Sequence, residues 1–259
     1  FDTKDLEDAF NVSVADFQNS SFTYYNKLLP FIHSNERFFL IDSDVVWLGD
    51  LVPYLEQFDE DFIAVSFPEK DVDVFINKWF FNLDLLRQEH PQYIFPGFLF
   101  YSGQLVVTGS KFNFSDFQNI LIGKEMPKPR REDIFVGEDQ GILNFIVAEK
   151  LRKGQISYRD IQYMIERWSA EINSINFDDV LNKKPHPFLV HWNGPKHGFL
   201  SFLPQSKLLF FFEGLYYSKL KNGNIKKHSS RLTRSVKNGN RFLYETAKKI
   251  LQVLKLKRS

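Results

Sequence analysis

The sequence contains no cysteine among its 259 residues. Disulfides, thiolate zinc sites and a cysteine nucleophile are therefore excluded, although the absence does not choose a compartment. No uninterrupted apolar stretch approaches the roughly 20 residues that a membrane-spanning helix needs. The chain also lacks a signal-peptide pattern and begins at Phe1, from which we expect a missing or processed N-terminus.

Acidic residues are nearly absent from the C-terminal part of the chain. From Lys219 to the last residue there are thirteen Lys or Arg and one acid, Glu245, so this segment has a net charge of +12 in a chain whose total is +1. Asn-Gly pairs and many Ser and Lys over 221–240 indicate a linker. Over 241–258 apolar residues recur at helical spacing with lysines around them. We expect a basic linker and an amphipathic helix at 221–259.

Such a helix has three interpretations: a solvated helix, a nucleic-acid contact, or an anchor on anionic lipid. Leucines on one face with flanking lysines favour an anionic membrane surface as the partner of 241–258. The sequence contains no recognised nucleic-acid-binding module, so we expect no nucleic acid as a partner. This pattern favours a cytoplasmic protein held at the inner face of a membrane.

What the chain does have is the composition of a globular protein, with 43% apolar and 25% charged residues. Its 29 phenylalanines are spread through apolar runs, which is typical of core positions. A chain of this length can bury one large core. We expect a single α/β domain over residues 1–220.

The stretch Arg37–Leu51 carries the strongest pattern. Its apolar run Phe38–Ile41 leads straight into Asp42 and Asp44. Such a run predicts a strand covered on both faces, as in a mostly parallel sheet, where ligands gather beyond the carboxyl ends of the strands. Two carboxylates this close repel each other unless a cation is bound between them. The pair therefore indicates a divalent cation.

Apolar spacing and turn residues predict the other elements. We expect helices at 21–32, 51–58, 114–122, 138–150 and 208–220, and strands at 61–67 and 188–190. Residues 95–108 predict a strand pair, or one strand bent at Ser102-Gly103. We expect a basic loop at 124–131 and irregular structure over 151–187.

Several motifs follow one another in a recognisable order. They are Thr23-Tyr24-Tyr25 with Leu28-Leu29-Pro30, Asp42-Ser43-Asp44 with Asp50-Leu51, Ser102-Gly103, Asp139-Gln140, and His191 with Gly194 and Lys196. In this order they resemble the nucleotide-sugar glycosyltransferases of the GT-A fold, nearest to glycosyltransferase family 8, over about residues 21–217. The resemblance implies a mostly parallel central sheet flanked by helices. Too little chain precedes Asp42 for the opening strands of that family, so we expect an N-terminally incomplete domain.

The resemblance also implies a role for each residue. Asp42, Asp44 and His191 would hold Mn2+ or Mg2+, and the donor would be a nucleotide-diphosphate sugar, with UDP-sugars favoured. Asp139 would orient donor hydroxyls, and the Gln140 amide would stabilise positive charge on the sugar carbon, with retention. A glycan or a lipid-linked acceptor would receive the sugar. The residues implied in donor binding are Asp42, Ser43, Asp44, Ser102, Gly103, Gly194 and Lys196.

The sequence departs from the family near the donor. Asn26 stands where the family has Arg, with Lys27 beside it, and Tyr101 stands where the family has Asn. These losses are compatible with a catalytically inactive sugar-binding protein.

Two further interpretations stay open. The string that begins at Asp42 also fits haloacid-dehalogenase-type phosphatases, in which the first aspartate is a nucleophile and Thr108 would serve downstream. Asp139 is equally explained by the ordinary preference of the first helical turn for acids.

Overall fold

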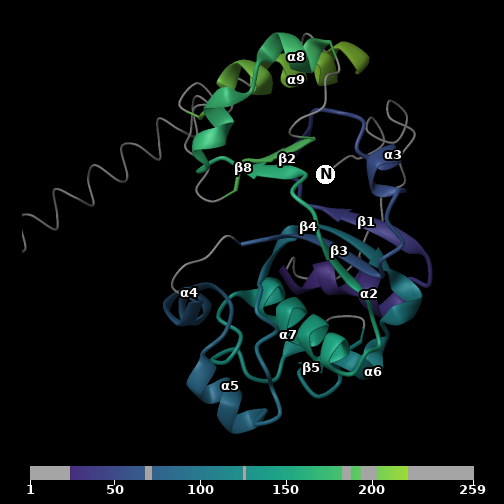
Figure 1. Cartoon of the computed structure of the whole chain (residues 1–259), viewed down its shortest axis with the longest axis vertical. Coiled ribbons are helices and arrows are strands. Elements are labelled where there is room, and N and C mark those ends of the chain that lie inside the picture. The colour runs from purple at the N-terminus through teal and green to yellow at the C-terminus, as the bar shows by residue number, and fades with distance from the viewer. Residues whose placement is uncertain (1–23, 68–71, 125–126, 183–187, 194–202, 221–259) are drawn as a thin grey trace, which may run out of the picture. The chain divides into compact units, whose positions relative to one another are not determined.

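The computed structural model describes residues 24–67, 72–124, 127–182, 188–193 and 203–220 (Figure 1). These residues belong to two compact units. The larger unit contains the described residues up to Glu166 together with 188–192, and the smaller unit contains the rest. The linker and helix expected at 221–259 lie outside the described residues. They remain predictions, as does the domain boundary there.

The larger unit is built on a four-stranded sheet with strand order β1-β4-β3-β7. Its strands are β1 (Arg37–Ile41), β3 (Phe62–Ser66), β4 (Phe100–Thr108) and β7 (Tyr158–Asp160). β4 runs antiparallel to both β1 and β3, whereas β7 is parallel to β3. The fold is therefore mixed α/β, and the expectation of a mostly parallel sheet is wrong. Apolar runs indicate buried strands but carry no information about strand direction.

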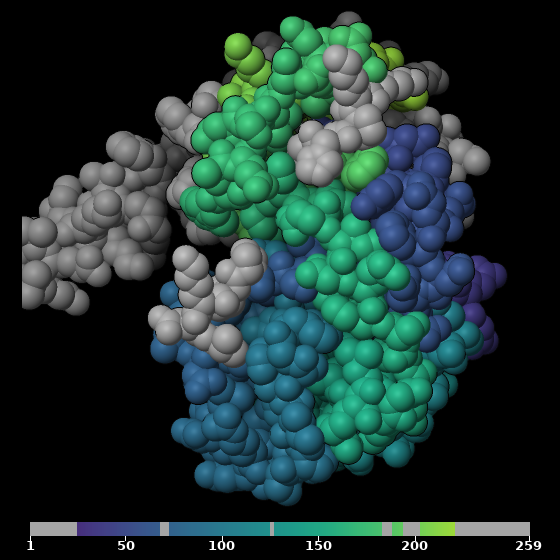
Figure 2. Space-filling view, viewed as in Figure 1, coloured from purple at the N-terminus to yellow at the C-terminus, as the bar shows by residue number. Residues whose placement is uncertain are grey.

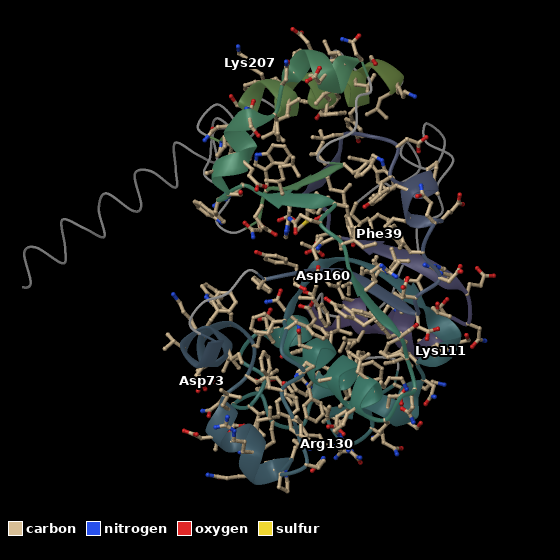
Figure 3. The ribbon with its side chains drawn as sticks, in the orientation of Figure 1. Phe39, Asp73, Lys111, Arg130, Asp160 and Lys207 are labelled. Carbon is tan, nitrogen blue, oxygen red and sulfur yellow. The ribbon has the colours of Figure 1, made fainter. Side chains whose placement is uncertain are left out.

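Helices cover one face of this sheet. They are η1 (Tyr24–Leu28), α2 (Leu29–His33), α4 (Val72–Trp79), α5 (Leu83–Glu89), α6 (Phe114–Phe117) and α7 (Glu138–Arg152). Alternate strand residues, among them Phe62, Ala64, Leu105 and Val107, pack with these helices in one hydrophobic cluster. Figure 3 shows the side chains that fill this layer, and Figure 2 shows α4 and α5 on one side of the unit's surface.

A three-stranded sheet and a short helix cover the opposite face. The sheet has the order β2-β9-β8 and consists of β2 (Val45–Trp47), β8 (Met164–Glu166) and β9 (Leu189–His191), and the helix is α3 (Val52–Leu55). Ile63, Val65 and Val106 of the central sheet form a second hydrophobic cluster with Leu55 of α3 and Leu189 of β9. The turn between β1 and β2 therefore carries the chain from one sheet to the other.

β1 is less buried than its apolar sequence predicts. Phe38, Phe39 and Leu40 are half-buried, and Ile41 is exposed. Within the described part of the chain, β1 pairs with β4 and with no other strand. The run is therefore a half-covered edge strand there, which corrects the expectation of a strand covered on both faces.

β4 is one continuous strand, which excludes the strand pair and agrees with the other alternative, a single strand. Its irregularity lies in its pairing with β3, where the register shifts between Ala64 and Ser66. Opposite these residues β4 runs from Phe100 to Leu105. A bulge of this kind re-aims side chains, and it lies where Ser102 and Gly103 approach the site described below.

Three other expectations are corrected in detail. The helix expected at 114–122 ends at Phe117 and is followed by β5 (Leu121–Ile122). β5 pairs with β6 (Lys128–Pro129), which lies inside the expected basic loop. The stretch 151–187 contains β7, β8 and two short helices where we expected irregular structure. β7 and β8 pair with strands distant in the sequence, and β5 and β6 form a short local hairpin. None of these strands is long enough to show a periodicity that would reveal it.

α7 confirms the helix expected at 138–150 and is largely enclosed within the larger unit, because eleven of its fifteen residues are buried. Gly137 and Gly141 allow its first turn to approach the chain at the end of α4. A Cβ at either position would collide with a backbone carbonyl oxygen there. The Asn144 amide accepts a hydrogen bond from Phe100 N at 3.0 Å and donates one to Phe100 O at 3.1 Å. These bonds fix α7 to β4.

In its described residues, the smaller unit contains η3 (Ala170–Ser174), α8 (Phe177–Leu181) and α9 (Ser206–Lys219). α9 confirms the helix expected at 208–220. Phe177 of α8 packs edge-on against Phe211 of α9. Among the helices of the described residues, none combines the length and the apolar character needed to cross a membrane.

Candidate metal centre

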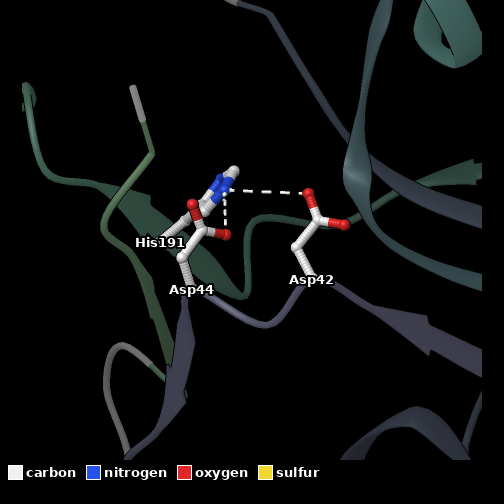
Figure 4. A group of neighbouring side chains, drawn as sticks. All are labelled: Asp42, Asp44 and His191. Carbon is white, nitrogen blue, oxygen red and sulfur yellow. Dashed lines mark hydrogen bonds and ion pairs between the residues drawn. The ribbon is translucent and has the colours of Figure 1, made fainter. Parts of the chain in front are cut away.

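Two aspartates and a histidine converge where the four-stranded and three-stranded sheets of the larger unit meet. Asp42 directly follows β1, and Asp44 directly precedes β2. β2 pairs antiparallel with β9, so that Val45 stands opposite His191. Potential ligand atoms of Asp42, Asp44 and His191 all lie within 4.8 Å of one another (Figure 4). The structure thus brings together the three residues that the sequence indicated as metal ligands.

The imidazole of His191 is held between carboxylates. Its Nε2 lies 3.1 Å from Asp44 Oδ1 and 4.0 Å from Asp42 Oδ2, and its Nδ1 lies 2.8 Å from Glu166 Oε1. Glu166 and His191 are paired residues of the parallel strands β8 and β9. A carboxylate on one ring nitrogen orients the other nitrogen, as is usual for metal-binding histidines. Nothing in the sequence motifs pointed to Glu166, because its proximity depends on strand pairing.

The surroundings of His191 favour a positive charge. Burial lowers the pKa of the imidazole, but its hydrogen bonds and charge interactions with Asp44 and Glu166 outweigh burial and raise the pKa to about 9. This environment is strongly negative and attracts cations. A metal ion bound at Nε2 replaces the proton there.

Gly103 of β4 gives the two ligand strands room to meet. A Cβ at this position would lie 2.8 Å from His191 Cε1 and 3.1 Å from Asp42 Oδ2. Its carbonyl oxygen accepts a hydrogen bond of 2.7 Å from Asp42 N, which fixes the backbone just beyond β1. Glycine is therefore needed here for the close approach and not for a left-handed conformation.

The side chains of Asp42, Asp44 and His191 are suitable ligands for a divalent cation. Two carboxylates and one imidazole suit Mn2+, whereas Mg2+ prefers oxygen ligands and keeps more of its water. Asp42 and Asp44 are partly exposed, whereas His191 is only 7% exposed. The two carboxylates are therefore accessible to solvent, and the imidazole is buried. Ser43 is exposed in the turn between the two aspartates.

Lys27 of η1 connects this centre to α7. Its Nζ lies 2.8 Å from Asp42 Oδ1, 3.1 Å from Asp42 Oδ2 and 3.2 Å from Asp139 Oδ2. Burial lowers the pKa of Lys27, but the charges of Asp139 and Asp42 outweigh it and raise the pKa above its usual value. The sequence offered a signal, because Lys27 stands next to Asn26, where the family has Arg. Its contact with both aspartates could not be read from that position.

Asp139 and Gln140 lie in the first turn of α7 beside β4. Asp139 is 5% exposed, and burial raises the pKa of its carboxyl group, although Lys27 and the Ser102 hydroxyl oppose that shift. The Gln140 amide oxygen accepts a hydrogen bond of 3.3 Å from Ser102 N. Lys27 therefore connects the Asp-Gln pair to the group formed by Asp42, Asp44 and His191, and Ser102 connects it to β4.

The residue before this pair has an unusual backbone. Glu138 adopts φ of 53°, the left-handed region that residues with a Cβ rarely occupy. Strain of this kind is often found at functional sites. Burial and the charge of Asp139 also raise the pKa of Glu138.

Thr108, which the phosphatase interpretation requires, lies at the wrong end of β4. It pairs with Arg37 at the start of β1, whereas Ile41, next to Asp42, pairs with Gln104. Four residues of strand, about 13 Å at the usual rise, separate the two positions. Gly194 and Lys196, expected at the diphosphate, lie outside the described residues and remain predictions.

Comparison with known proteins adds a limited likeness. No family model matches the chain, and no curated protein sequence matches it significantly. The apo structure of WbbM, a bifunctional glycosyltransferase, is 14% identical with a TM-score of 0.45, and the match covers 73% of this chain and 35% of that one. The glycosyltransferase GlyE of Streptococcus pneumoniae TIGR4 is 14% identical with a TM-score of 0.39, covering 80% and 46%. This chain therefore matches less than half the length of each. At these scores the function must be inferred from the side chains of the site.

Proposed function

We propose that this chain is a metal-dependent glycosyltransferase of the GT-A fold, which transfers a hexose from a nucleotide-diphosphate sugar, in the first instance a UDP-sugar. One observation carries the proposal: Asp42, Asp44 and His191 converge, and Lys27 joins them to Asp139 at the start of α7. A diphosphate requires a hard cation and a fixed positive charge, and a sugar requires hydrogen-bonding groups next to them. Both are supplied within one set of contacts.

In the proposed reaction the bond between the anomeric carbon and the β-phosphate oxygen breaks, and the acceptor oxygen forms the new bond to that carbon. The acceptor proton passes to the departing phosphate oxygen. Mn2+ bound at the centre would neutralise the diphosphate. Asp139 would orient donor hydroxyls, and the Gln140 amide would stabilise the positive charge on the sugar. Retention rests on the family resemblance. Because an amide is a poor nucleophile, a retaining reaction here would proceed by front-face attack without a covalent intermediate.

A glycan or a lipid-linked molecule is the proposed acceptor. The net charge of +12 from Lys219 onward supports an anionic membrane surface as a partner of 241–258 and a peripheral position on the inner face of a membrane. Liposome co-sedimentation tests this directly. Binding to anionic vesicles should disappear when residues 221–259 are deleted, and binding that persists after the deletion contradicts the assignment.

One experiment distinguishes the proposed glycosyltransferase from an inactive sugar-binding protein and from a phosphatase. Purified protein with Mn2+ is titrated with UDP and UDP-hexoses, and release of UDP is followed, for the wild type and for Asp42→Asn. We expect donor binding and slow hydrolysis in the wild type, both reduced at least about a hundredfold in the variant because a metal ligand is lost. Binding without turnover supports an inactive sugar-binding protein. Generic phosphatase activity that is lost in Asp42→Asn would replace the proposal.

A further inference from the structure

We propose that Lys27 is an internal counter-charge that makes the centre bind a divalent cation weakly by itself and tightly together with a diphosphate. This inference rests on the proposed function, and it assigns to Lys27 a defined part in the coupling between the cation and the diphosphate. Lys27 would contact the diphosphate directly, and Asp42 and Asp139 would hold its ammonium in place.

The first step is the contact with Asp42. The Lys27 ammonium lies within 3.1 Å of both carboxylate oxygens of Asp42, and Asp42 is also a proposed metal ligand. A carboxylate has about four lone-pair positions, so it can accept from an ammonium and bind a cation at the same time. The two positive charges would then lie a few ångströms apart in a partly buried site. Their repulsion must reduce the affinity for the cation.

The second step is the contact with Asp139, which keeps the ammonium in place. Lys27 cannot swing away without removing its charge from the Asp139 carboxylate, which is 5% exposed and 3.2 Å from Nζ. Leaving a buried carboxylate without its cation costs more than the loss of a surface ion pair. Asp139 thus holds the lysine beside Asp42 when a metal ion binds.

The consequence is a local repulsion between two positive charges, even though the four surrounding carboxylates balance them overall. A divalent cation and Lys27 share Asp42, and a ligand that brings several negative charges relieves their repulsion. A diphosphate does so, because its oxygens can contact both cations. Coupling between two ligands is reciprocal, so the cation must raise diphosphate affinity by the factor by which the diphosphate raises cation affinity.

Among the residues that the structure describes, Lys27 is the lysine whose ammonium contacts both Asp42 and Asp139. Lys111 is a paired lysine elsewhere in the larger unit, with its ammonium 3.4 Å from Asp61 Oδ1. Lys111 follows β4 at the end where Thr108 pairs with Arg37, away from Asp42 (labelled in Figure 3). It provides a matched control for the loss of a paired lysine.

The experiment measures binding and needs no turnover. Calorimetric titrations with Mn2+ alone, with UDP in saturating Mn2+, and with pyrophosphate in saturating Mn2+ are compared for the wild type, Lys27→Gln, Lys27→Met, Lys27→Arg and Lys111→Gln. Gln retains a hydrogen-bond donor for Asp139, and Met removes it, so two neutral variants are available if one folds poorly. Pyrophosphate separates the diphosphate contribution from contacts with the base.

We expect both neutral variants to bind Mn2+ alone roughly tenfold more tightly and to bind either diphosphate in Mn2+ roughly tenfold more weakly. Lys27→Arg should retain the coupling, and Lys111→Gln should match the wild type. The inference is overturned if a folded neutral variant shows wild-type coupling, or if Mn2+ and diphosphate affinities fall together. If the wild type binds Mn2+ but neither diphosphate, the proposed function and the coupling are both overturned. The Mn2+ affinities of the wild type and the neutral variants would then still test whether the charge of Lys27 weakens cation binding.

Discussion

Gly103→Ala is the substitution that tests the geometry of the centre most directly. The added methyl carbon would lie 2.8 Å from His191 Cε1, 3.1 Å from Asp42 Oδ2 and 3.3 Å from His191 Nδ1, where ordinary contacts are about 3.5 to 4.0 Å. Both ligands must therefore move by several tenths of an ångström. Overpacking of this size costs about 1 to 3 kcal/mol. If that cost appears in metal binding, Mn2+ affinity falls about 5- to 150-fold.

Gly109→Ala is the matched control, because it adds the same methyl group at the other end of β4. There the Cβ would lie 2.5 Å from Ser34 O and 2.6 Å from Glu36 O, which are backbone atoms remote from the ligands. We expect this variant to lower Tm by about 2 to 12 °C and to keep wild-type Mn2+ affinity. Calorimetry and thermal unfolding together measure both effects. If Gly103→Ala binds Mn2+ as the wild type does, the close packing of His191 and Asp42 around β4 is wrong.

Two further substitutions test the supports of the site. Glu166→Gln should weaken Mn2+ binding by about 10- to 100-fold in the same titration, because the carboxylate that orients His191 becomes an amide; unchanged affinity would mean that the ring needs no such partner. Asn144→Ala should lower the free energy of unfolding in urea by about 2 to 4 kcal/mol, because the buried N–H and C=O of Phe100 lose their partners. A loss below about 0.5 kcal/mol would show that another group or water replaces the amide.

The grouping of Asp42, Asp44 and His191 could be predicted because of where these residues stand in the sequence. Each follows or adjoins an apolar run, and the resemblance joined the aspartates to the distant histidine. Their roles remain proposals. The helix that carries Asp139 could also be predicted, since acids in its first turn and apolar residues at helical spacing occur together.

Lys27 and Glu166 could not be predicted from local patterns. Lys27 reaches Asp139 only because η1 packs beside α7, and Glu166 reaches His191 only because β8 pairs with β9. The direction of the strands could not be predicted for the same reason. β4 lies antiparallel between β1 and β3, although a long stretch of chain separates it from both in the sequence. Strand pairing and strand direction depend on how distant segments pack together, and no short stretch of sequence contains that information.

The two aspartates on either side of Ser43 are attached to different sheets. Asp42 directly follows a strand of the four-stranded sheet, and Asp44 directly precedes a strand of the three-stranded sheet that also carries His191. A cation held by all three would join the two sheets, which the chain itself also connects at Ser43 and between β7 and β8. A shift of one sheet relative to the other would change the distances among the three ligand side chains. Any event that shifts the small sheet would therefore retune the affinity for the ion, even if no ligand were altered.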